Sequence, residues 1–86
     1  MSITLLVVDD EENFRMNITD FLESQGFEVI GVPDLASARS CLQRGDGDVI
    51  LLDVRLPDGY GPNLLHEVAQ LSFQHRPPVI MITANG

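Results

Sequence analysis

Two patterns of apolar and polar positions alternate along the 86 residues. Residues 3–8, 27–32, 48–54 and 79–82 are short runs rich in apolar and β-branched side chains, each bounded by an acidic residue, glycine or proline. Such runs predict strands. The third run is apolar without alternation at 49–52, which is typical of a parallel strand covered on both faces of its sheet.

Between these runs, apolar side chains recur at helical spacing. The first helix is expected over residues 12–25, ends at Gly26 and carries an apolar face of four residues: Phe14, Ile18, Phe21 and Leu22. The second is expected from residue 35 to near Gly45, with Asp34 as its N-cap and an apolar face of Leu35, Ala38 and Leu42.

A third helix is expected after Pro62, which suits the first turn of a helix. Its apolar face has four members: Leu64, Leu65, Val68 and Leu71. Residues 55–61 contain one proline and two glycines, and are therefore expected to form a loop.

Strands that alternate with helices predict an α/β fold with a parallel sheet, because right-handed crossovers place the helices on the faces of the sheet. We expect a flavodoxin-like strand order, 2-1-3-4, in which the first and third strands are neighbours at the topological switch point. Ligands of such sheets bind there, at the carboxyl ends of the strands.

Acidic residues follow both strands that meet at this point. Asp9 and Asp10 come directly after the first strand, and Asp53 lies at the carboxyl end of the third. Crowded carboxylates repel one another and raise some pKa values unless a cation is present. Because all the nearby ligands are hard oxygens, the cluster suits Mg²⁺ or Mn²⁺.

An aspartate in such a pocket can attack phosphorus as a nucleophile. Thr83, at the end of the fourth strand, carries a hydroxyl that can donate a hydrogen bond to a phosphoryl oxygen. Each of these residues, taken alone, also fits a purely structural role. Asp9 and Asp10, for example, suit the first turn of a helix. The joint pattern favours phosphoryl chemistry.

Composition narrows the range of partners. Thirteen acidic residues face five basic ones, all of them arginine, and the formal net charge is −8. An acidic chain repels phosphates, so we expect no direct contact with nucleic acid. No run approaches the ~20 apolar residues of a membrane span, and no signal peptide is evident, so we expect no membrane contact and a cytoplasmic location. The single cysteine, Cys41, has the spacing of a buried thiol.

Three segments resemble the receiver domain of two-component response regulators: LLVVDDEE at 5–12, DVILLDVRLPDGYG at 48–61 and PVIMITANG at 78–86. They occur in the family's order and extend over the whole chain. The resemblance implies a signalling domain that is phosphorylated by a sensor histidine kinase and regulates an output domain, and that is not itself an enzyme. Residues 53–59 are also similar to receivers of transcriptional activators of the nitrogen-regulator class.

The resemblance also implies a role for each polar residue at this edge of the sheet. Asp53 corresponds to the phosphoacceptor. Asp10 corresponds to a direct Mg²⁺ ligand, and Asp9 completes the acidic pocket, partly through water. Arg55 corresponds to the position that gives its backbone carbonyl to the metal, and Thr83 to the switch hydroxyl.

One feature of the family is missing from the sequence. Receivers carry a lysine on a fifth strand that pairs with the phosphoryl group, and this sequence contains no lysine. We therefore expect residues 1–86 to be a single incomplete receiver domain, without the family's fourth helix, fifth strand and fifth helix. Phosphorylation would then be impaired, because one cation is absent. The open edge of the strand at 79–82 would invite self-association with another chain.

Three other functions fit parts of this pattern. A phosphatase with an aspartyl nucleophile usually has a second acid two residues after it, where this chain has Arg55. A flavin-binding module needs a phosphate loop after the first strand, where this chain has four acids that would repel phosphate. A docking or dimerisation module that works without phosphorylation, or a piece cut from a longer protein, is the alternative that stays open.

Overall fold

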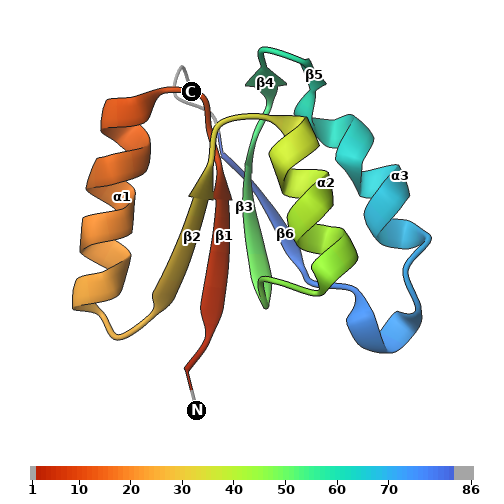
Figure 1. Cartoon of the computed structure of the whole chain (residues 1–86), viewed down its shortest axis with the longest axis horizontal. Helices are drawn as coiled ribbons and strands as arrows, with labels where there is room; N and C mark the ends of the chain where they lie inside the picture. Colours follow the sequence, from red (N-terminus) through yellow and green to blue (C-terminus); the bar gives the residue numbers. More distant parts are fainter. Residues whose placement is uncertain (1, 83–86) are drawn as a thin grey trace.

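The computed structural model describes residues 2–82, apart from the side chain of residue 73. Its strands are β1 (Thr4–Val8), β2 (Glu28–Val32), β3 (Val49–Asp53), β4 (Arg55–Leu56), β5 (Gly59–Tyr60) and β6 (Val79–Ile82). Its α-helices are α1 (Glu12–Ser24), α2 (Leu35–Arg44) and α3 (Leu64–Ala69), with 3₁₀ turns at Gly61–Asn63 and Phe73–His75. Four strands form a parallel sheet in the order β2-β1-β3-β6, which confirms the expected fold class and strand order (Figure 1).

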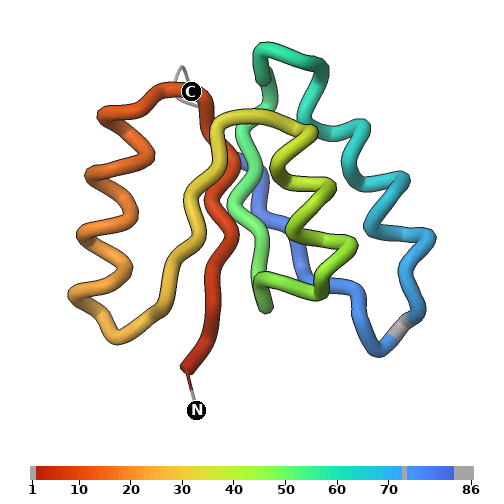
Figure 2. Tube along the Cα trace, viewed as in Figure 1, coloured from red at the N-terminus to blue at the C-terminus, as the bar shows by residue number. Residues whose placement is uncertain are grey.

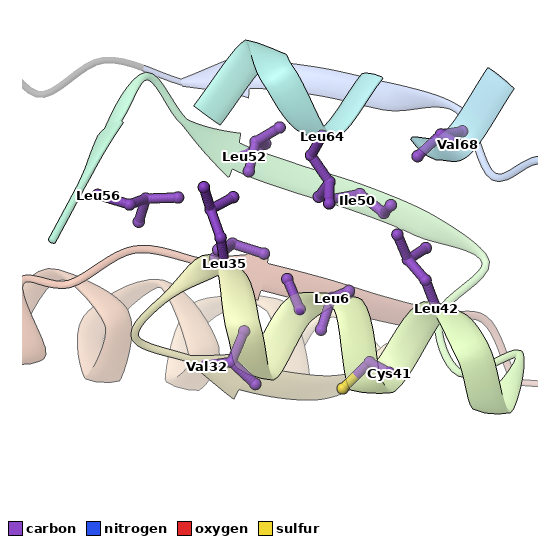
Figure 3. Close-up of a cluster of buried hydrophobic side chains, with 12 residues drawn as sticks. Leu6, Val32, Leu35, Cys41, Leu42, Ile50, Leu52, Leu56, Leu64 and Val68 are labelled. Atoms are coloured by element: carbon purple, nitrogen blue, oxygen red, sulfur yellow. The ribbon is translucent and has the colours of Figure 1, made fainter. Parts of the chain in front are cut away.

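The main core lies between the sheet and helices α2 and α3. Leu6 and Val8 of β1 are in register with Ile50 and Leu52 of β3. These four side chains are buried in one cluster with residues of both helices, among them Leu35 and Cys41 of α2 and Leu64 of α3 (Figure 3). The other members of the cluster are Val32, Ala38, Leu42, Leu56 and Val68. Full burial of one such side chain contributes about 1.5–3 kcal/mol, so this cluster is the principal source of stability.

The opposite face of the sheet is covered by α1, which packs over β1 and β2. Successive side chains of a strand point to opposite faces, so Val7 faces away from the main core and is in register with Gly31 of β2. A Cβ at Gly31 would lie 3.1 Å from Cγ of Arg15. The missing side chain at Gly31 therefore makes room for the aliphatic part of Arg15.

The apolar face predicted for α1 is wrong at one position. Phe14, Ile18 and Leu22 are half-buried, whereas Phe21 is 61% exposed. Because Arg15 also lies against the sheet, the buried face is centred between Ile18 and Leu22. At about 100° per residue, Phe21 lies just beyond Phe14, at the solvent edge of that face.

Helix α2 begins and ends as the sequence predicts. Asp34 is its N-cap and accepts a hydrogen bond of 2.8 Å from the amide of Ser37. Gly45 follows its last residue in the left-handed conformation, with φ of 75°. The thiol of Cys41 is buried on this helix, as expected.

The segment after β3 differs from the expected loop and long helix. Residues 55–60 form a short antiparallel hairpin, in which Arg55 pairs with Tyr60 and Leu56 with Gly59. Helix α3 ends at Ala69, so Leu71 lies outside it, although Leu71 still packs against the main core. The amide of Leu71 donates to the carbonyl of Val68, a bond between residues three apart that is typical of a 3₁₀ ending.

Strand β6 lies at one edge of the described sheet and pairs with β3. Its Ile80 side chain is 52% exposed. Each helix within residues 2–82 is too short or too polar to cross a membrane.

Candidate functional site

Three carboxylates meet at the carboxyl ends of β1 and β3. Val8 is in register with Leu52, so the next residues, Asp9 just after β1 and Asp53 at the end of β3, lie side by side. One carboxylate oxygen each of Asp9, Asp10 and Asp53 lies within 4.8 Å of the other two. The structure thus brings together the three acids that the sequence places at the topological switch point.

Asp9 is the one buried polar or charged side chain among the described residues, with 3% of it exposed. Its Oδ1 accepts a hydrogen bond of 2.8 Å from the amide of Glu11. Burial raises the pKa of the Asp9 carboxyl, and the negative charges of Asp53, Asp10 and Glu11 raise it further, while the bond from Glu11 lowers it in part. Ionisation of Asp9 therefore costs more free energy in the folded chain than in the unfolded chain, and a nearby cation would reduce that cost.

Helix α1, which follows Asp9 and Asp10 in the chain, supports this pocket. Glu11 is the N-cap of α1 and accepts hydrogen bonds from the amides of Asn13, at 3.2 Å, and Phe14, at 2.8 Å. Arg15 extends back from the helix, and its Nη1 donates a bond of 2.7 Å to the backbone carbonyl of Asp9. The turn that carries the first two acids is therefore held by the helix that follows it.

The donor set fits a divalent cation. Carboxylate oxygens are hard ligands of the kind that Mg²⁺ binds, usually through one or two carboxylates together with waters. Burial is the main cause of the raised pKa of Asp9, and a cation at this point would offset the repulsion from the neighbouring carboxylates that adds to it. A metal held by Asp9 and Asp10 would lie beside the carboxylate of Asp53.

Two further residues were predicted at this site. Arg55 begins β4, two residues after Asp53, and its side chain is exposed. Its candidate contribution is a backbone carbonyl, and that role stays a prediction. Thr83 lies outside the described residues, although Ile82, the last residue of β6, is in register with Asp53.

Sequence reasoning missed Asp58, which lies at the turn of the β4–β5 hairpin. Its Oδ1 accepts from the amide of Leu35, at 2.8 Å, and its Oδ2 accepts from the amide of Ala36, at 3.0 Å. The bond from Leu35, and then that from Ala36, lowers the pKa of the Asp58 carboxyl. The sequence around Asp58 does not predict this contact, because the two amides that bond to Asp58 belong to α2, more than 20 residues earlier in the chain.

Gly61 follows the hairpin and lies against the backbone of Asp53. Its amide donates a bond of 2.7 Å to the carbonyl of Val54. A Cβ on Gly61 would overlap the backbone carbonyl oxygen of Asp53. A glycine in the turn-rich segment after Asp53 was visible in the sequence, but this close approach was not.

Comparison with known families gives a match over nearly the whole chain. The family described as the response regulator receiver domain matches residues 5–86. The regulatory protein VanRc of Enterococcus gallinarum is 38% identical over 86 residues, which are all of this chain and 36% of that protein. The phosphate regulon transcriptional regulatory protein PhoB of Escherichia coli is 36% identical over the same length, which is 38% of that protein. The chain thus spans little more than a third of these relatives.

A solved structure agrees with the fold. The receiver domain of the sensor histidine kinase PA1611 from Pseudomonas aeruginosa superposes with a TM-score of 0.87 and 32% identity, over 99% of this chain and 70% of that one. That structure has a magnesium ion coordinated in its active-site cleft. The nitrogen-regulator likeness is not tested by these relatives and stays a prediction.

Proposed function

Because the chain belongs to the response-regulator receiver family, we propose that it is a phosphoacceptor signalling domain that takes a phosphoryl group onto Asp53 with Mg²⁺ as its cofactor. The observation that supports this most is the convergence of Asp9, Asp10 and Asp53 within 4.8 Å at the sheet edge. In this proposal the domain is an acceptor in signal transduction, and not an enzyme with a separate substrate.

The residues divide the chemistry among them. An Asp53 carboxylate oxygen forms the new bond to phosphorus, and the bond from phosphorus to the donor's imidazole nitrogen breaks. Bound Mg²⁺ would neutralise charge on the phosphoryl group. Asp9, Asp10, Asp53 and the backbone carbonyl of Arg55 are the proposed ligands, and the hydroxyl of Thr83 is the proposed donor to a phosphoryl oxygen.

The proposed partner is a sensor histidine kinase in the cytoplasm. The named relatives are regulatory proteins, PhoB a transcriptional one, so control of transcription through an output domain is the proposed role of a longer protein. The net charge of −8 makes direct contact of this segment with nucleic acid unfavourable.

As an 86-residue polypeptide, the chain is also proposed to self-associate along β6. The strand pairs with β3 on one side, and Ile80 is largely exposed. An uncovered strand edge is a template for pairing with another chain. Sedimentation over a range of concentrations should show a mass that rises with concentration, and a constant monomer mass would contradict this point.

Phosphoryl uptake at Asp53 is tested by intact-mass measurement after incubation with acetyl phosphate and Mg²⁺. The chain should gain the mass of one phosphoryl group, at a reduced rate because the sequence contains no lysine to pair with that group, and an Asp53→Ala variant should gain none. Asp46→Ala is a matched control, because Asp46 is an acid paired with Arg44 in the loop after α2, outside the acidic cluster.

No uptake by a chain that circular dichroism shows to be folded would contradict the proposal. It would favour one of the alternatives: a docking or dimerisation module that works without phosphorylation, or a piece cut from a longer protein whose phosphorylation is impaired because the sequence contains no lysine. Uptake that persists in Asp53→Ala would mean that another residue is the acceptor.

A further inference from the structure

The β4–β5 hairpin is attached to α2 through Asp58. The two oxygens of this one carboxylate accept the first two amides of the helix, those of Leu35 at 2.8 Å and Ala36 at 3.0 Å. The first amides of a helix have no partner within the helix and carry partial positive charge. Two bonds to one planar group fix the orientation of the carboxylate as well as its position.

Apolar contacts hold the same turn. Leu56 of the hairpin and Leu35 of α2 are both buried in the main core (Figure 3). A Cβ on Gly59 would lie 2.9 Å from Cδ1 of Leu35. The backbone of the turn therefore sits directly on the first residue of α2, and Asp58 is held in reach of its partners.

The other end of the hairpin is held against the backbone of Asp53, the proposed phosphoacceptor. Arg55 and Tyr60 pair across the hairpin, and the amide of Gly61 bonds to the carbonyl of Val54. The backbone of Gly61 also packs against the carbonyl of Asp53. Figure 2 shows this hairpin at the same end of the sheet as the start of α2. The hairpin thus links the turn at Asp58 to the backbone beside Asp53.

We infer that Asp58 is a positioning residue, which holds the backbone of residues 53–55 for metal binding by anchoring the hairpin to the start of α2. The inference rests on the proposed function, since it concerns Mg²⁺ at the three acids. Asp58 is separate from those acids and is not a metal ligand in this proposal. Among the described residues, the bonds from Leu35 and Ala36 to Asp58 are the only side-chain hydrogen bonds between the turn and α2. Without them, the proposed metal ligands in residues 53–55 are less well ordered.

Asp34 provides a matched control within the same helix. It also accepts a bond at the start of α2, from the amide of Ser37 at 2.8 Å, but it lies outside the hairpin. Asp34→Ala and Asp58→Ala therefore both remove a carboxylate cap from α2. Only Asp58→Ala also releases the hairpin.

The test is the Mg²⁺ dissociation constant of the 86-residue chain and both variants, measured from backbone amide shifts in an NMR titration. Asp58→Ala should bind Mg²⁺ about tenfold more weakly, the lower end of the effect seen when support for metal ligands is removed. Asp34→Ala should bind within about twofold of the parent chain, as expected for a site that is not coupled.

Equal affinity in Asp58→Ala and the parent chain would overturn the inference. Equal weakening in both variants would also overturn it, because the cause would then be the loss of α2 stability. A parent chain that binds no Mg²⁺ would instead contradict the proposed function itself, and the inference with it.

A second measurement needs no variant and stays informative if Asp58→Ala does not fold. Mg²⁺ added to the parent chain should shift the amide resonances of Leu35 and Ala36, which bond to Asp58, more than that of Ser37, which bonds to Asp34. Equal or absent shifts at these three amides would contradict the coupling.

Discussion

A carboxylate oxygen of Asp9 lies within 4.8 Å of one of Asp53, although Asp9 follows β1 and Asp53 ends β3. Asp9 is buried there, and burial together with the charges of Asp53 and Asp10 raises its pKa. The pocket is therefore built at a cost to the stability of the metal-free chain, which a cation would offset.

Asp9→Asn should stabilise the chain at pH 7 without metal, by on the order of 1 kcal/mol, the usual size of a single-residue effect. The pKa of Asp9 is higher in the folded chain than in the unfolded chain, so its favourable contribution is present at pH values below the unfolded pKa. This contribution is lost as pH rises through the folded pKa. Thermal melts from pH 3 to 7 should therefore show a growing advantage of the variant.

The same variant should lose the stabilisation that Mg²⁺ gives the parent chain, which is about 2.7 kcal/mol at a hundredfold excess over the dissociation constant. Asp20→Asn is a suitable control, because Asp20 is an exposed acid on α1 outside the cluster. A variant that is less stable than the parent chain at pH 7 would contradict the electrostatic account of the pocket.

Asp58 should give the opposite pH dependence. Its hydrogen bonds from Leu35 and Ala36 lower its pKa in the folded chain. Its stabilising effect is therefore present above the unfolded pKa and is lost as pH falls through the folded pKa. The melting temperatures of the parent chain and Asp58→Asn should differ at pH 7 and converge at lower pH, and a constant difference would count against this explanation.

Gly61→Ala should destabilise the fold because its Cβ would overlap the carbonyl oxygen of Asp53. Forcing an extra carbon into a filled space costs about 1–3 kcal/mol. Asn63→Ala, two residues later, should change the free energy of unfolding by less than about 0.5 kcal/mol, since Asn63 is exposed and makes no capping bond. Urea unfolding gives the free energy of unfolding of both variants. Similar changes in the two variants would show that the backbone near residue 61 can shift to accommodate the Cβ without strain.

Leu64 and Leu65 are neighbours on α3 with opposite surroundings. Leu64 is 0% exposed and Leu65 is 42% exposed. Leu64→Ala should lower the free energy of unfolding by about 2–5 kcal/mol, as for other buried leucines, and Leu65→Ala by less than about 0.5 kcal/mol. Comparable losses in urea unfolding would mean that Leu65 is covered in solution, for example by a second chain.

Local patterns determined most of the elements. The apolar runs predict the four strands of the sheet, and Asp34 and Gly45 mark both ends of α2, because caps and turns depend on neighbours in the chain. The handedness of crossovers predicted a parallel sheet with helices on its faces, and the flavodoxin-like strand order expected for such a chain is the order observed. That order alone was enough to bring Asp9 and Asp53 to one edge of the sheet.

The tertiary structure decided what local patterns do not contain. Phe21 is exposed because Arg15 packs over Gly31 and turns the buried face of α1. Asp58 caps α2, and Gly61 packs on the carbonyl of Asp53, through contacts between segments that the chain separates. The alternation of side chains reports only which face of an element is covered. Which residue meets which partner depends on how the elements pack, and only the folded chain brings those partners together.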